Sequence, residues 1–380
     1  MKFFADSLSQ GLKRGQMVCG DVFRIARTAS GTFFTVCDGV GSGVYANISA
    51  LTCASRLLEL FRSGVGVQAA SEMVAVSMHR ARTEDIPFSA FTAACVFPDG
   101  RFQCYAYEAP PPILIREGAP EALPLRRYGA GRETIGEASG SLSLGDALTV
   151  FSDGVSEAGL GRGYSYGIGA AEAAAFMGRC LAEGERLSGL PARIIDMCRK
   201  ASGGRHADDA TAALVECRAA SELTLLTGPP SRRSLDAACV RDFMAQPGLK
   251  AACGSTTADI LSRELGAPAR MLVAEEAFGQ PPEYLVEGVD LVTEGAITLN
   301  QAYNILDAPL DRLGGNTPAE RLCLMLRKAD VIRLMIGGAP NIAHEDLMFR
   351  QIGVRVRQSA VALISEALRN MGKLVTVKRY

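Results

Sequence analysis

The chain has 380 residues, of which 48% are hydrophobic and 21% are charged. At about 150 residues per domain this length predicts two or three domains, and the hydrophobic content excludes disorder over most of the chain. The 40 basic and 41 acidic residues leave a formal charge of −1, which argues against a dedicated nucleic-acid binder and against a polybasic membrane protein.

Cysteine and histidine usage predicts a cytoplasmic protein without a zinc site. The 11 cysteines form no C-x-x-C pair and lie in apolar stretches, as reduced, buried cysteines do. The three histidines are far apart in sequence, which disfavours zinc. No run of about 18 apolar residues predicts a membrane span, and the first residues lack the apolar core of a signal peptide.

The first predicted elements are a strand and two helices. The strand Gly31–Cys37 is rich in β-branched and aromatic residues and ends at Asp38-Gly39. A helix is expected from about Val44 and a second over 69–82. Apolar residues recur at helical spacing in the first helix and predict its buried face: Val44, Ile48, Leu51, Ala54, Leu58 and Phe61.

The next segments predict two strand pairs. Phe91–Phe97 and Arg101–Tyr107 are joined by Pro98-Asp99-Gly100, which predicts a β-hairpin. Ser141–Leu144 and Ala147–Phe151 flank Gly145-Asp146, which predicts another tight turn. Asp99 and Asp146 are therefore interpreted as turn residues. Two helices over about 170–182 and 191–201 and a strand, Ala210–Glu216, complete this region.

A change of pattern near Cys217–Glu222 predicts a domain boundary. Beyond it, apolar strands alternate with amphipathic helices, which predicts an α/β domain over 223–380 with a partly parallel sheet. The expected strands are Leu223–Thr227, Met271–Ala274, Asp290–Thr293 and Val331–Ile336. The expected helices lie near 232–245, 256–265, 297–306, 318–329 and 355–371. Thr317-Pro318-Ala319-Glu320 reads as a capping box.

Four acidic residues share one local pattern. Asp38 and Asp153 each end an apolar strand and precede glycine, Asp21 follows Gly20 at the start of a strand, and Asp208 precedes the last strand of the first region. Carboxylates at strand ends can converge at one edge of a sheet, where they repel one another unless cations bind. Mg²⁺ and Mn²⁺ suit such oxygen ligands. Each of these residues alone would be interpreted as a turn aspartate.

The ordered set of motifs resembles a known phosphatase family. The motifs are Gly20-Asp21, Cys37-Asp38-Gly39-Val40-Gly41-Ser42-Gly43-Val44-Tyr45-Ala46, Phe151-Ser152-Asp153-Gly154-Val155-Ser156-Glu157 and Asp208-Asp209-Ala210-Thr211. Over about residues 8–217 they resemble the bacterial stage II sporulation protein E type of metal-dependent protein phosphatase, within the protein phosphatase 2C superfamily. The resemblance implies an α+β chain: a layered phosphatase domain over 1–220, with two antiparallel sheets flanked by helices, followed by the smaller α/β domain.

The same resemblance implies a metal site and a reaction. It implies two ions, Mn²⁺ or Mg²⁺, and the hydrolysis of phosphoserine or phosphothreonine by a metal-activated water without a protein nucleophile. Asp38 would bridge both ions and Gly39 would offer its carbonyl to one of them. Asp21 and Asp208 would each bind one ion, and Asp153 would complete the second. Asp38 and Asp153 are thus the expected catalytic residues, while Asp209, where many relatives carry asparagine, is a weaker candidate.

Some positions depart from the superfamily's pattern. Val40 stands where one branch has a histidine, so no side chain is evident as the general acid for the leaving serine oxygen. The phosphate-binding arginine has no matching motif, and Lys13 and Arg14 are candidates only by proximity. For His206, a surface-loop histidine is favoured over a residue that supports the metal ligands.

The segment Gly41–Ala46 also fits a dinucleotide-binding fingerprint, G-x-G-x-x-A, between a strand and a helix. The rest of that unit requires a second parallel strand soon after the helix. A second helical stretch follows instead, and the next clear strand begins near Phe91. We therefore favour the metal-site interpretation of these glycines.

The second domain carries weaker signals. Leu225–Ser234 and Cys253–Thr257 each lead into a helix and could bind an anion at its N-terminus, but ordinary capping is favoured for both. Asp290–Gly295 repeats the pattern of strand, acid and glycine without partner motifs, and Gly337-Gly338 is a ligand-facing turn or a bend. The expected role of residues 223–380 is that of a regulatory or sensor domain whose ligand is unknown.

Two classes of function remain at this stage. The first is a protein phosphatase acting on a phosphorylated regulatory protein, such as an anti-sigma-factor antagonist. The alternative is a pseudo-phosphatase signalling module whose second domain binds a small ligand or nucleotide. No nucleic-acid or membrane partner is expected, and the oligomeric state, a homodimer included, stays open.

Overall fold

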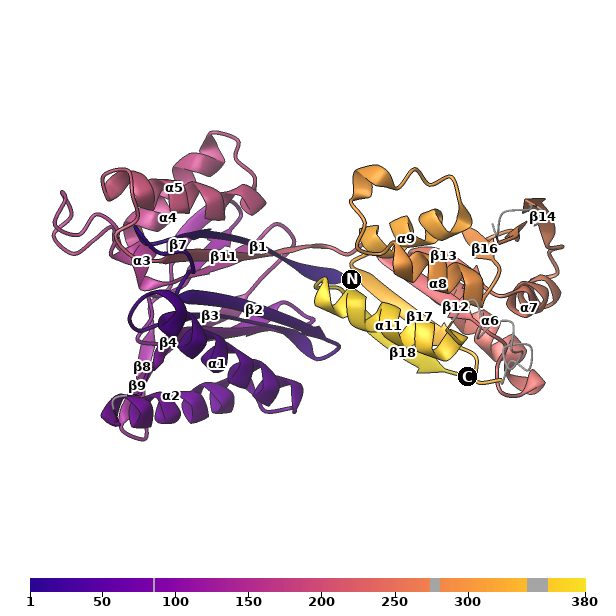
Figure 1. Cartoon of the computed structure of the whole chain (residues 1–380), viewed down its shortest axis with the longest axis horizontal. Helices are drawn as coiled ribbons and strands as arrows, with labels where there is room; N and C mark the ends of the chain where they lie inside the picture. The colour runs from indigo at the N-terminus through magenta and orange to yellow at the C-terminus, as the bar shows by residue number, and fades with distance from the viewer. Residues whose placement is uncertain (85, 274–280, 340–354) are drawn as a thin grey trace. The chain divides into compact units, whose positions relative to one another are not determined.

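The computed structural model describes residues 1–84, 86–273, 281–339 and 355–380. The chain divides into two compact units, Met1–Ala219 and Ala220–Tyr380, which are coloured indigo to pink and pink to yellow in Figure 1. Within the described ranges, none of the helices combines the length and the apolar character that crossing a membrane requires.

Unit 1 contains eleven strands in its described residues. They are β1 (Lys2–Gly11), β2 (Asp21–Thr28), β3 (Gly31–Gly39), β4 (Ser89–Val96), β5 (Arg101–Tyr107), β6 (Ile113–Arg116), β7 (Ala119–Ala122), β8 (Arg126–Ala130), β9 (Glu133–Ser141), β10 (Ala147–Phe151) and β11 (Ala210–Ala219). Its helices are α1 (Gly43–Arg62), α2 (Val67–Thr83), the short α3 (Asp153–Ser156), α4 (Gly169–Ala182), a 3-10 turn over Leu187–Gly189, and α5 (Leu190–Ala201).

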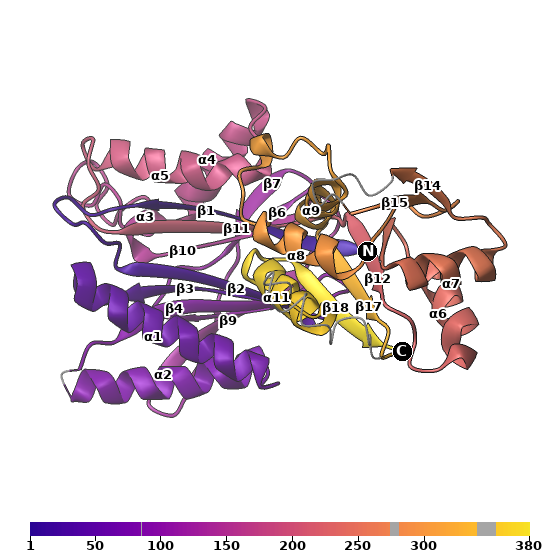
Figure 2. The ribbon, with the colours of Figure 1, turned by 45° about the vertical axis from the view of Figure 1, so that its right-hand side comes forward.

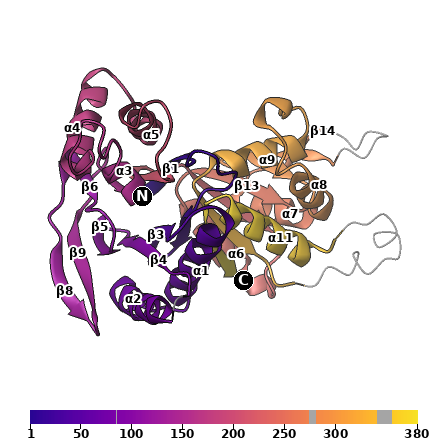
Figure 3. The ribbon, with the colours of Figure 1, turned by 60° about the vertical axis from the view of Figure 1, so that its left-hand side comes forward.

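The strands of unit 1 form two antiparallel sheets. One has five strands in the order β1-β11-β10-β6-β7, and the other has six in the order β2-β3-β4-β5-β9-β8. Figures 2 and 3 show α4 and α5 over the outer face of the first sheet and α1 and α2 over the outer face of the second. The expected layered architecture of two sheets flanked by helices is therefore confirmed.

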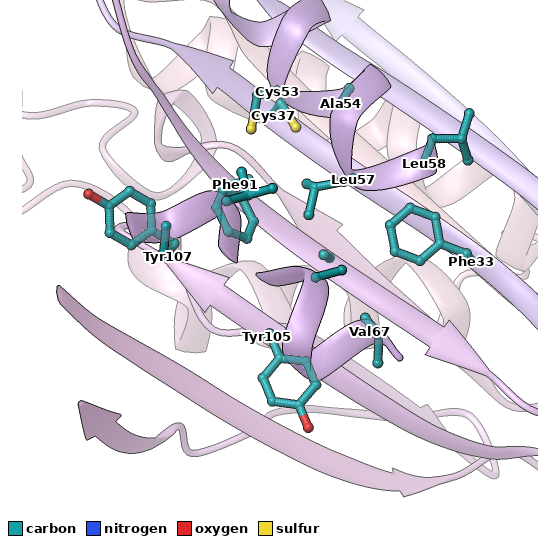
Figure 4. Packing of buried hydrophobic residues seen from close by; sticks show 14 of the residues in the cluster. Phe33, Cys37, Cys53, Ala54, Leu57, Leu58, Val67, Phe91, Tyr105 and Tyr107 are labelled. Atoms are coloured by element: carbon teal, nitrogen blue, oxygen red, sulfur yellow. The ribbon is translucent and has the colours of Figure 1, made fainter. Parts of the chain in front are cut away.

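Strand alternation explains why each sheet can be covered on both faces. Successive side chains of a strand point to opposite faces. In β3, Phe33 and Cys37 pack against α1 and α2, whereas Phe34 and Val36 pack into the core between the two sheets. Figure 4 shows the first of these cores, where Cys37 lies beside Cys53 and Leu57 of α1.

The buried face of α1 differs from the expected one. Val44, Ile48 and Leu51 are exposed, and small residues are buried instead. The buried set is Gly43, Ala46, Ser49, Ala50, Cys53, Ala54, Leu57 and Leu58. Small side chains allow the helix to lie close to β2 and β3. The close packing, and not the spacing of the large apolar residues, therefore determines which face of α1 is buried. An apolar stripe of α1 is therefore left on the surface.

The first strand pair of the sequence prediction is confirmed and the second is wrong. β4 and β5 pair as a hairpin, with Gly100 at a φ of 98° in its turn. In contrast, 142–144 is not a strand, and β9 and β10 belong to different sheets. Asp146 acts as a turn residue, since its side chain accepts hydrogen bonds from the amides of Ser143 and Glu117 at 2.8 and 3.1 Å.

Unit 2 is built around one mixed sheet. Its strands are β12 (Glu222–Thr227), β13 (Leu249–Cys253), β14 (Arg270–Val273), β15 (Glu283–Leu285), β16 (Leu291–Thr293), β17 (Val331–Ile336) and β18 (Leu374–Arg379). Its helices are a 3-10 turn over Arg233–Leu235, α6 (Asp236–Ala245), α7 (Ser255–Leu265), α8 (Ala296–Asn304), a second 3-10 turn over Leu310–Arg312, α9 (Pro318–Lys328) and α11 (Arg357–Asn370).

The expected alternation of strands and helices is confirmed for unit 2. The order β16-β13-β12-β17-β18 is parallel throughout, and β14 and β15 add an antiparallel edge. α8, α9 and α11 cover one face of the sheet, and α6 and α7 cover the other. The capping box at Thr317 is present. Ala274, the end of one expected strand, lies outside the described residues.

Candidate functional site

Two aspartates of the six-stranded sheet face the space between the sheets. Asp21 and Asp38 are direct partners in the antiparallel register of β2 and β3. Asp38 follows Phe34 and Val36 in the strand's alternation, so its side chain lies on the face that the other sheet covers. Like charges directly opposite each other destabilise a sheet. This pair therefore needs compensation from elsewhere.

The five-stranded sheet supplies the opposing groups. Ser152 follows β10, and its hydroxyl donates a 2.7 Å hydrogen bond to Asp21 Oδ2. The same hydroxyl accepts one from the amide of Thr211 at 3.0 Å. Asp153 is the first residue of α3 and lies against Asp38. The structure thus brings Asp153 to Asp21 and Asp38, which lie more than a hundred residues earlier in the chain.

Burial and mutual repulsion control the charge of this cluster. Burial and, after it, the negative charges of Asp21 and Asp153 together raise the pKa of Asp38 to about 10. Burial also raises the pKa of Asp21 to about 6, against hydrogen bonds from Ser152 and Thr211 that lower it. In the absence of a cation, Asp38 therefore holds a proton at neutral pH.

Asp209 fastens the loop between β1 and β2 beside the cluster. Its side chain is 4% exposed, and its two oxygens accept hydrogen bonds from the amides of Lys13 and Gly20, both at 2.8 Å. Both carboxylate oxygens are thus used within the protein. The geometry assigns Asp209 a supporting role that the sequence did not indicate.

Asp208 lies at the rim rather than in the buried cluster. Its side chain is 53% exposed and pairs with Lys13 Nζ at 3.1 Å. Burial raises the pKa of Glu157, and the charges of Asp153 and Asp208 raise it as well. Glu157 therefore lies near both of these residues. Glu157, which stands in the motif that begins at Phe151, is a further acidic group beside the site.

The glycines after Asp38 and Asp153 are required by close backbone contacts. A Cβ on Gly39 would lie 1.9 Å from the carbonyl oxygen of Ala46 in α1, and a Cβ on Gly154 would lie 1.9 Å from that of Asp209. Neither position can hold a side chain without moving its neighbour. The glycines therefore let α1 and the segment before β11 approach the acidic cluster.

The remaining candidate residues have the following places. Val40 is exposed, and its amide bonds to the carbonyl of Phe88. The ring of His206 packs over Gly11, and burial lowers its pKa, so it does not join the acidic cluster. The amide of Arg14 bonds to the carbonyl of His206.

The fingerprint at Gly41–Ala46 lies in the loop before α1 and in its first residues, and the next element after α1 is α2 and not a parallel strand. β3 has antiparallel neighbours on both sides, so the dinucleotide interpretation is excluded.

The donor set fits hard divalent cations. It offers carboxylates and the carbonyl of Gly39, which are oxygen ligands of the kind that Mg²⁺ and Mn²⁺ prefer. Asp21 Oδ1 is buried and has no hydrogen-bond partner, as expected for a ligand atom. Among the described residues no three acidic, histidine or cysteine side chains are already grouped around one point. Binding therefore requires the mutually repelling carboxylates to turn inward.

Comparison with known families decides the assignment. The model of the family "Stage II sporulation protein E (SpoIIE)" matches residues 28–218, which include Asp38, Asp153 and Asp208. The chain belongs to this family. Family membership identifies unit 1 as a protein serine/threonine phosphatase domain.

Solved structures with similar chains include bacterial phosphatases. The RsbU and RsbW domains of Rv1364c from Mycobacterium tuberculosis are 20% identical, with 70% of this chain and 71% of that chain covered and a TM-score of 0.49. The phosphatase domain of SpoIIE from Bacillus subtilis, with a fragment of its regulatory domain, is 18% identical, with 57% and 62% covered and a TM-score of 0.47. No curated protein matches the sequence significantly.

Proposed function

We propose that unit 1 catalyses the metal-dependent hydrolysis of phosphoserine or phosphothreonine in a regulatory protein. The observation that carries this proposal is the cluster of Asp21, Asp38 and Asp153, in which Asp21 is buried and the pKa of Asp38 is raised by burial and by the charges of its two neighbours. Such a cluster lowers the stability of the fold when no cation is bound, and its oxygen atoms are suited to binding divalent ions.

Two ions, Mn²⁺ or Mg²⁺, are the proposed cofactors. Asp38, which interacts with both Asp21 and Asp153, would bind both ions, and Gly39 would offer its carbonyl to one of them. Asp21, Asp153 and Asp208 are the other proposed ligands. When bound, the ions supply an activated water and neutralise phosphate oxygens.

Lys13 is the proposed phosphate-binding group. Its ammonium lies 3.1 Å from Asp208 Oδ1, and its backbone is held by Asp209. If Asp208 turns toward a cation, this ammonium becomes available to an incoming phosphate. Asp209 keeps the loop that carries Lys13 in place during this exchange.

Phosphatase turnover with Mn²⁺, and its loss on chelation, is the direct test. We expect Asp153→Asn to lower the hydrolysis of a phosphoserine peptide about 10³-fold, because it removes a ligand of the cations. Asp99→Asn is the matched control, since Asp99 also precedes a glycine but accepts hydrogen bonds within an exposed turn. Turnover that survives chelation and Asp153→Asn would contradict the proposal and favour the pseudo-phosphatase alternative.

Cation binding is expected to release protons. Asp38 is protonated at pH 7 in the metal-free protein because burial and its neighbours raise its pKa, and it must ionise to bind a cation. Titration calorimetry with Mn²⁺ in buffers of different ionisation enthalpy should therefore show about one proton released per chain at pH 7. Release is expected to disappear in Asp38→Asn, and an equal signal in the variant would refute the role of Asp38.

The exposed apolar stripe of α1 favours a protein substrate over a small one. Val44, Tyr45 and Ile48 are 58%, 79% and 55% exposed, and α1 begins only a few residues after Asp38. An apolar surface beside a phosphatase site is suited to docking a partner protein. We propose that a phosphorylated regulator, such as an anti-sigma-factor antagonist, docks there.

Substitution on this stripe should separate docking from chemistry. We expect Ile48→Glu to lower kcat/KM for a phosphorylated anti-sigma-factor antagonist at least tenfold and to leave p-nitrophenyl phosphate hydrolysis unchanged. Met73→Glu on α2 is the control, because Met73 is also an exposed apolar residue, at 48%. Equal effects of the two variants would argue against docking on α1.

For unit 2 we propose a regulatory or sensor role.

A further inference from the structure

The parallel strands of unit 2 follow a doubly wound order. Numbered along the chain, the order β16-β13-β12-β17-β18 reads 3-2-1-4-5, with helices on both faces of the sheet. In such sheets ligands bind outside the carboxyl ends of the strands, near the point where the strand order reverses. This edge is the place to look for a ligand site in unit 2.

A pocket of about 270 Å³ lies at this edge. It is lined by residues that follow β12, β13 and β16 and by the first residues of α7, α8 and α11. Its lining includes Gly228, Gly254, Ser255, Thr256, Glu294 and Arg357. Pockets for drug-sized ligands measure about 300–1,000 Å³, so this one suits a ligand near the lower end of that range.

Arg357 places a buried positive charge in the wall of the pocket. The residue is only 8% exposed. Its Nη2 donates to the carbonyls of Gly337 and Ala339, both at 3.0 Å, whereas its Nε is buried without a partner. In the described part of the chain no carboxylate pairs with it, and burial lowers its pKa. A buried cation that has no counter-ion among the described residues is suited to binding an anionic ligand.

The fold holds this guanidinium in place. A Cβ on Gly228 would lie 2.0 Å from Nη1 of Arg357, so only glycine leaves room for it after β12. The amide of Gly228 in turn donates to Thr257 Oγ1 at 3.0 Å, which links this loop to α7. The position of Arg357 is therefore set by its surroundings before any ligand binds.

The start of α7 offers hydrogen-bond donors beside Arg357. The residue before the helix is Gly254, and no side chain caps α7; the capping expected for Cys253–Thr257 is therefore wrong. The first amides of a helix lack partners within it and carry the positive end of its dipole. Ser255 and Thr256 add exposed hydroxyls. Helix starts of this kind bind phosphate groups.

Glu294 adds a negatively charged group to the lining of the pocket, in contrast to Arg357 and the start of α7. It follows β16, and its Oε2 accepts a 3.1 Å hydrogen bond from the amide of Ile297 at the start of α8. This carboxylate occupies the start of α8, so an anion is expected at α7 instead. Its remaining acceptor capacity suits a ligand hydroxyl.

We infer that unit 2 binds a small phosphate ester that carries free hydroxyl groups. The phosphate contacts Arg357 and the first amides of α7, and a hydroxyl donates to Glu294. Sugar phosphates and nucleotides share this chemistry. The site lies entirely within unit 2 and is independent of the proposed phosphatase reaction.

Calorimetric titration of the full chain in EDTA tests this site without hydrolysis of the probes. We expect both ribose 5-phosphate and AMP to bind, and the tighter of the two will indicate whether the natural ligand is a sugar phosphate or a nucleotide. Ribose, which lacks the phosphate, is not expected to bind. Arg357→Gln should weaken binding of the tighter probe at least tenfold. Arg241→Gln, which changes an exposed arginine of α6 outside the pocket, should not.

A second variant covers the case in which Arg357→Gln fails to fold. Ser255→Glu places a carboxylate at an exposed helix start, where it is compatible with the helix dipole but repels an anion. We expect it to fold as the unsubstituted chain does and to weaken binding at least tenfold. Absence of binding by both phosphate probes at 5 mM (about five times the upper end of ordinary KM values), or unchanged affinity in Ser255→Glu, would overturn the proposal.

Discussion

Asp38→Asn is expected to abolish phosphatase turnover and, at the same time, to stabilise the metal-free protein. The loss of turnover, about 10³-fold or more, follows from removing the carboxylate that is proposed to bind both cations. The gain in stability follows from removing a buried acid next to Asp21 and Asp153. We expect about 1–2 kcal/mol, or a few degrees in Tm by calorimetry at pH 8.

The pH dependence of this gain has a definite sign. The pKa of Asp38 is raised in the folded chain to about 10, from its ordinary value of 3.8. Between these values the folded state holds a proton that the unfolded state has released, so the free energy of unfolding falls as pH rises. The Tm difference between Asp38→Asn and the unsubstituted protein should therefore grow from pH 5 to pH 8.

Cations should reverse the ranking of the two proteins. Mn²⁺ binds the folded unsubstituted chain and raises its Tm by mass action, whereas Asp38→Asn should respond weakly. The control is Asp99→Asn, which changes a carboxylate in an exposed turn. An Asp38→Asn variant that is less stable than the unsubstituted protein without metal, or equally stabilised by Mn²⁺, would contradict this account of the cluster.

Gly39→Ala is expected to disable the site by a different route. Its Cβ would lie 1.9 Å from the carbonyl oxygen of Ala46, which is backbone and cannot rotate away. The start of α1 must therefore move, together with the strand end that carries Asp38. We expect a loss of about 2–3 kcal/mol in the free energy of unfolding and at least 100-fold in turnover, measured by denaturant titration and by peptide hydrolysis.

Gly129→Ala is the matched control for this substitution. Gly129 lies in β8, and a Cβ there meets nothing within 4 Å. The free energy of unfolding and the turnover of Gly129→Ala should both stay within error of those of the unsubstituted protein. Full activity in Gly39→Ala would show that α1 can shift without disturbing Asp38, and the close contact would then have no functional meaning.

Local pattern was sufficient to predict much of the fold. The hairpin around Asp99-Gly100, the capping box at Thr317 and the alternation of strands and helices beyond residue 223 depend on neighbours in sequence. Turn chemistry, caps and periodicity are properties of short segments. The ordered aspartate motifs are likewise local patterns, and they indicate the family without reference to the fold.

Packing decided what the local pattern could not. The periodicity of α1 predicted that Val44, Ile48 and Leu51 would be buried, but the close approach of the helix to β2 and β3 selects its small residues instead. The predicted pairing of Ser141–Leu144 with Ala147–Phe151 was also wrong, because 142–144 is not a strand and the chain passes there from one sheet to the other. Strand pairing depends on partners distant in sequence, which no short segment specifies.

By itself, the sequence determined the family, the two-domain organisation it predicts, and which aspartates are candidates for the metal site. Only the tertiary structure decided that Asp209 is the buried anchor and Asp208 the exposed neighbour, and that Arg357 joins Gly228 and Gly254 around one pocket. The reason is physical: burial, charge repulsion and the meeting of strand ends arise between segments that are far apart along the chain. Their strength is set by the three-dimensional environment and not by the residues on either side.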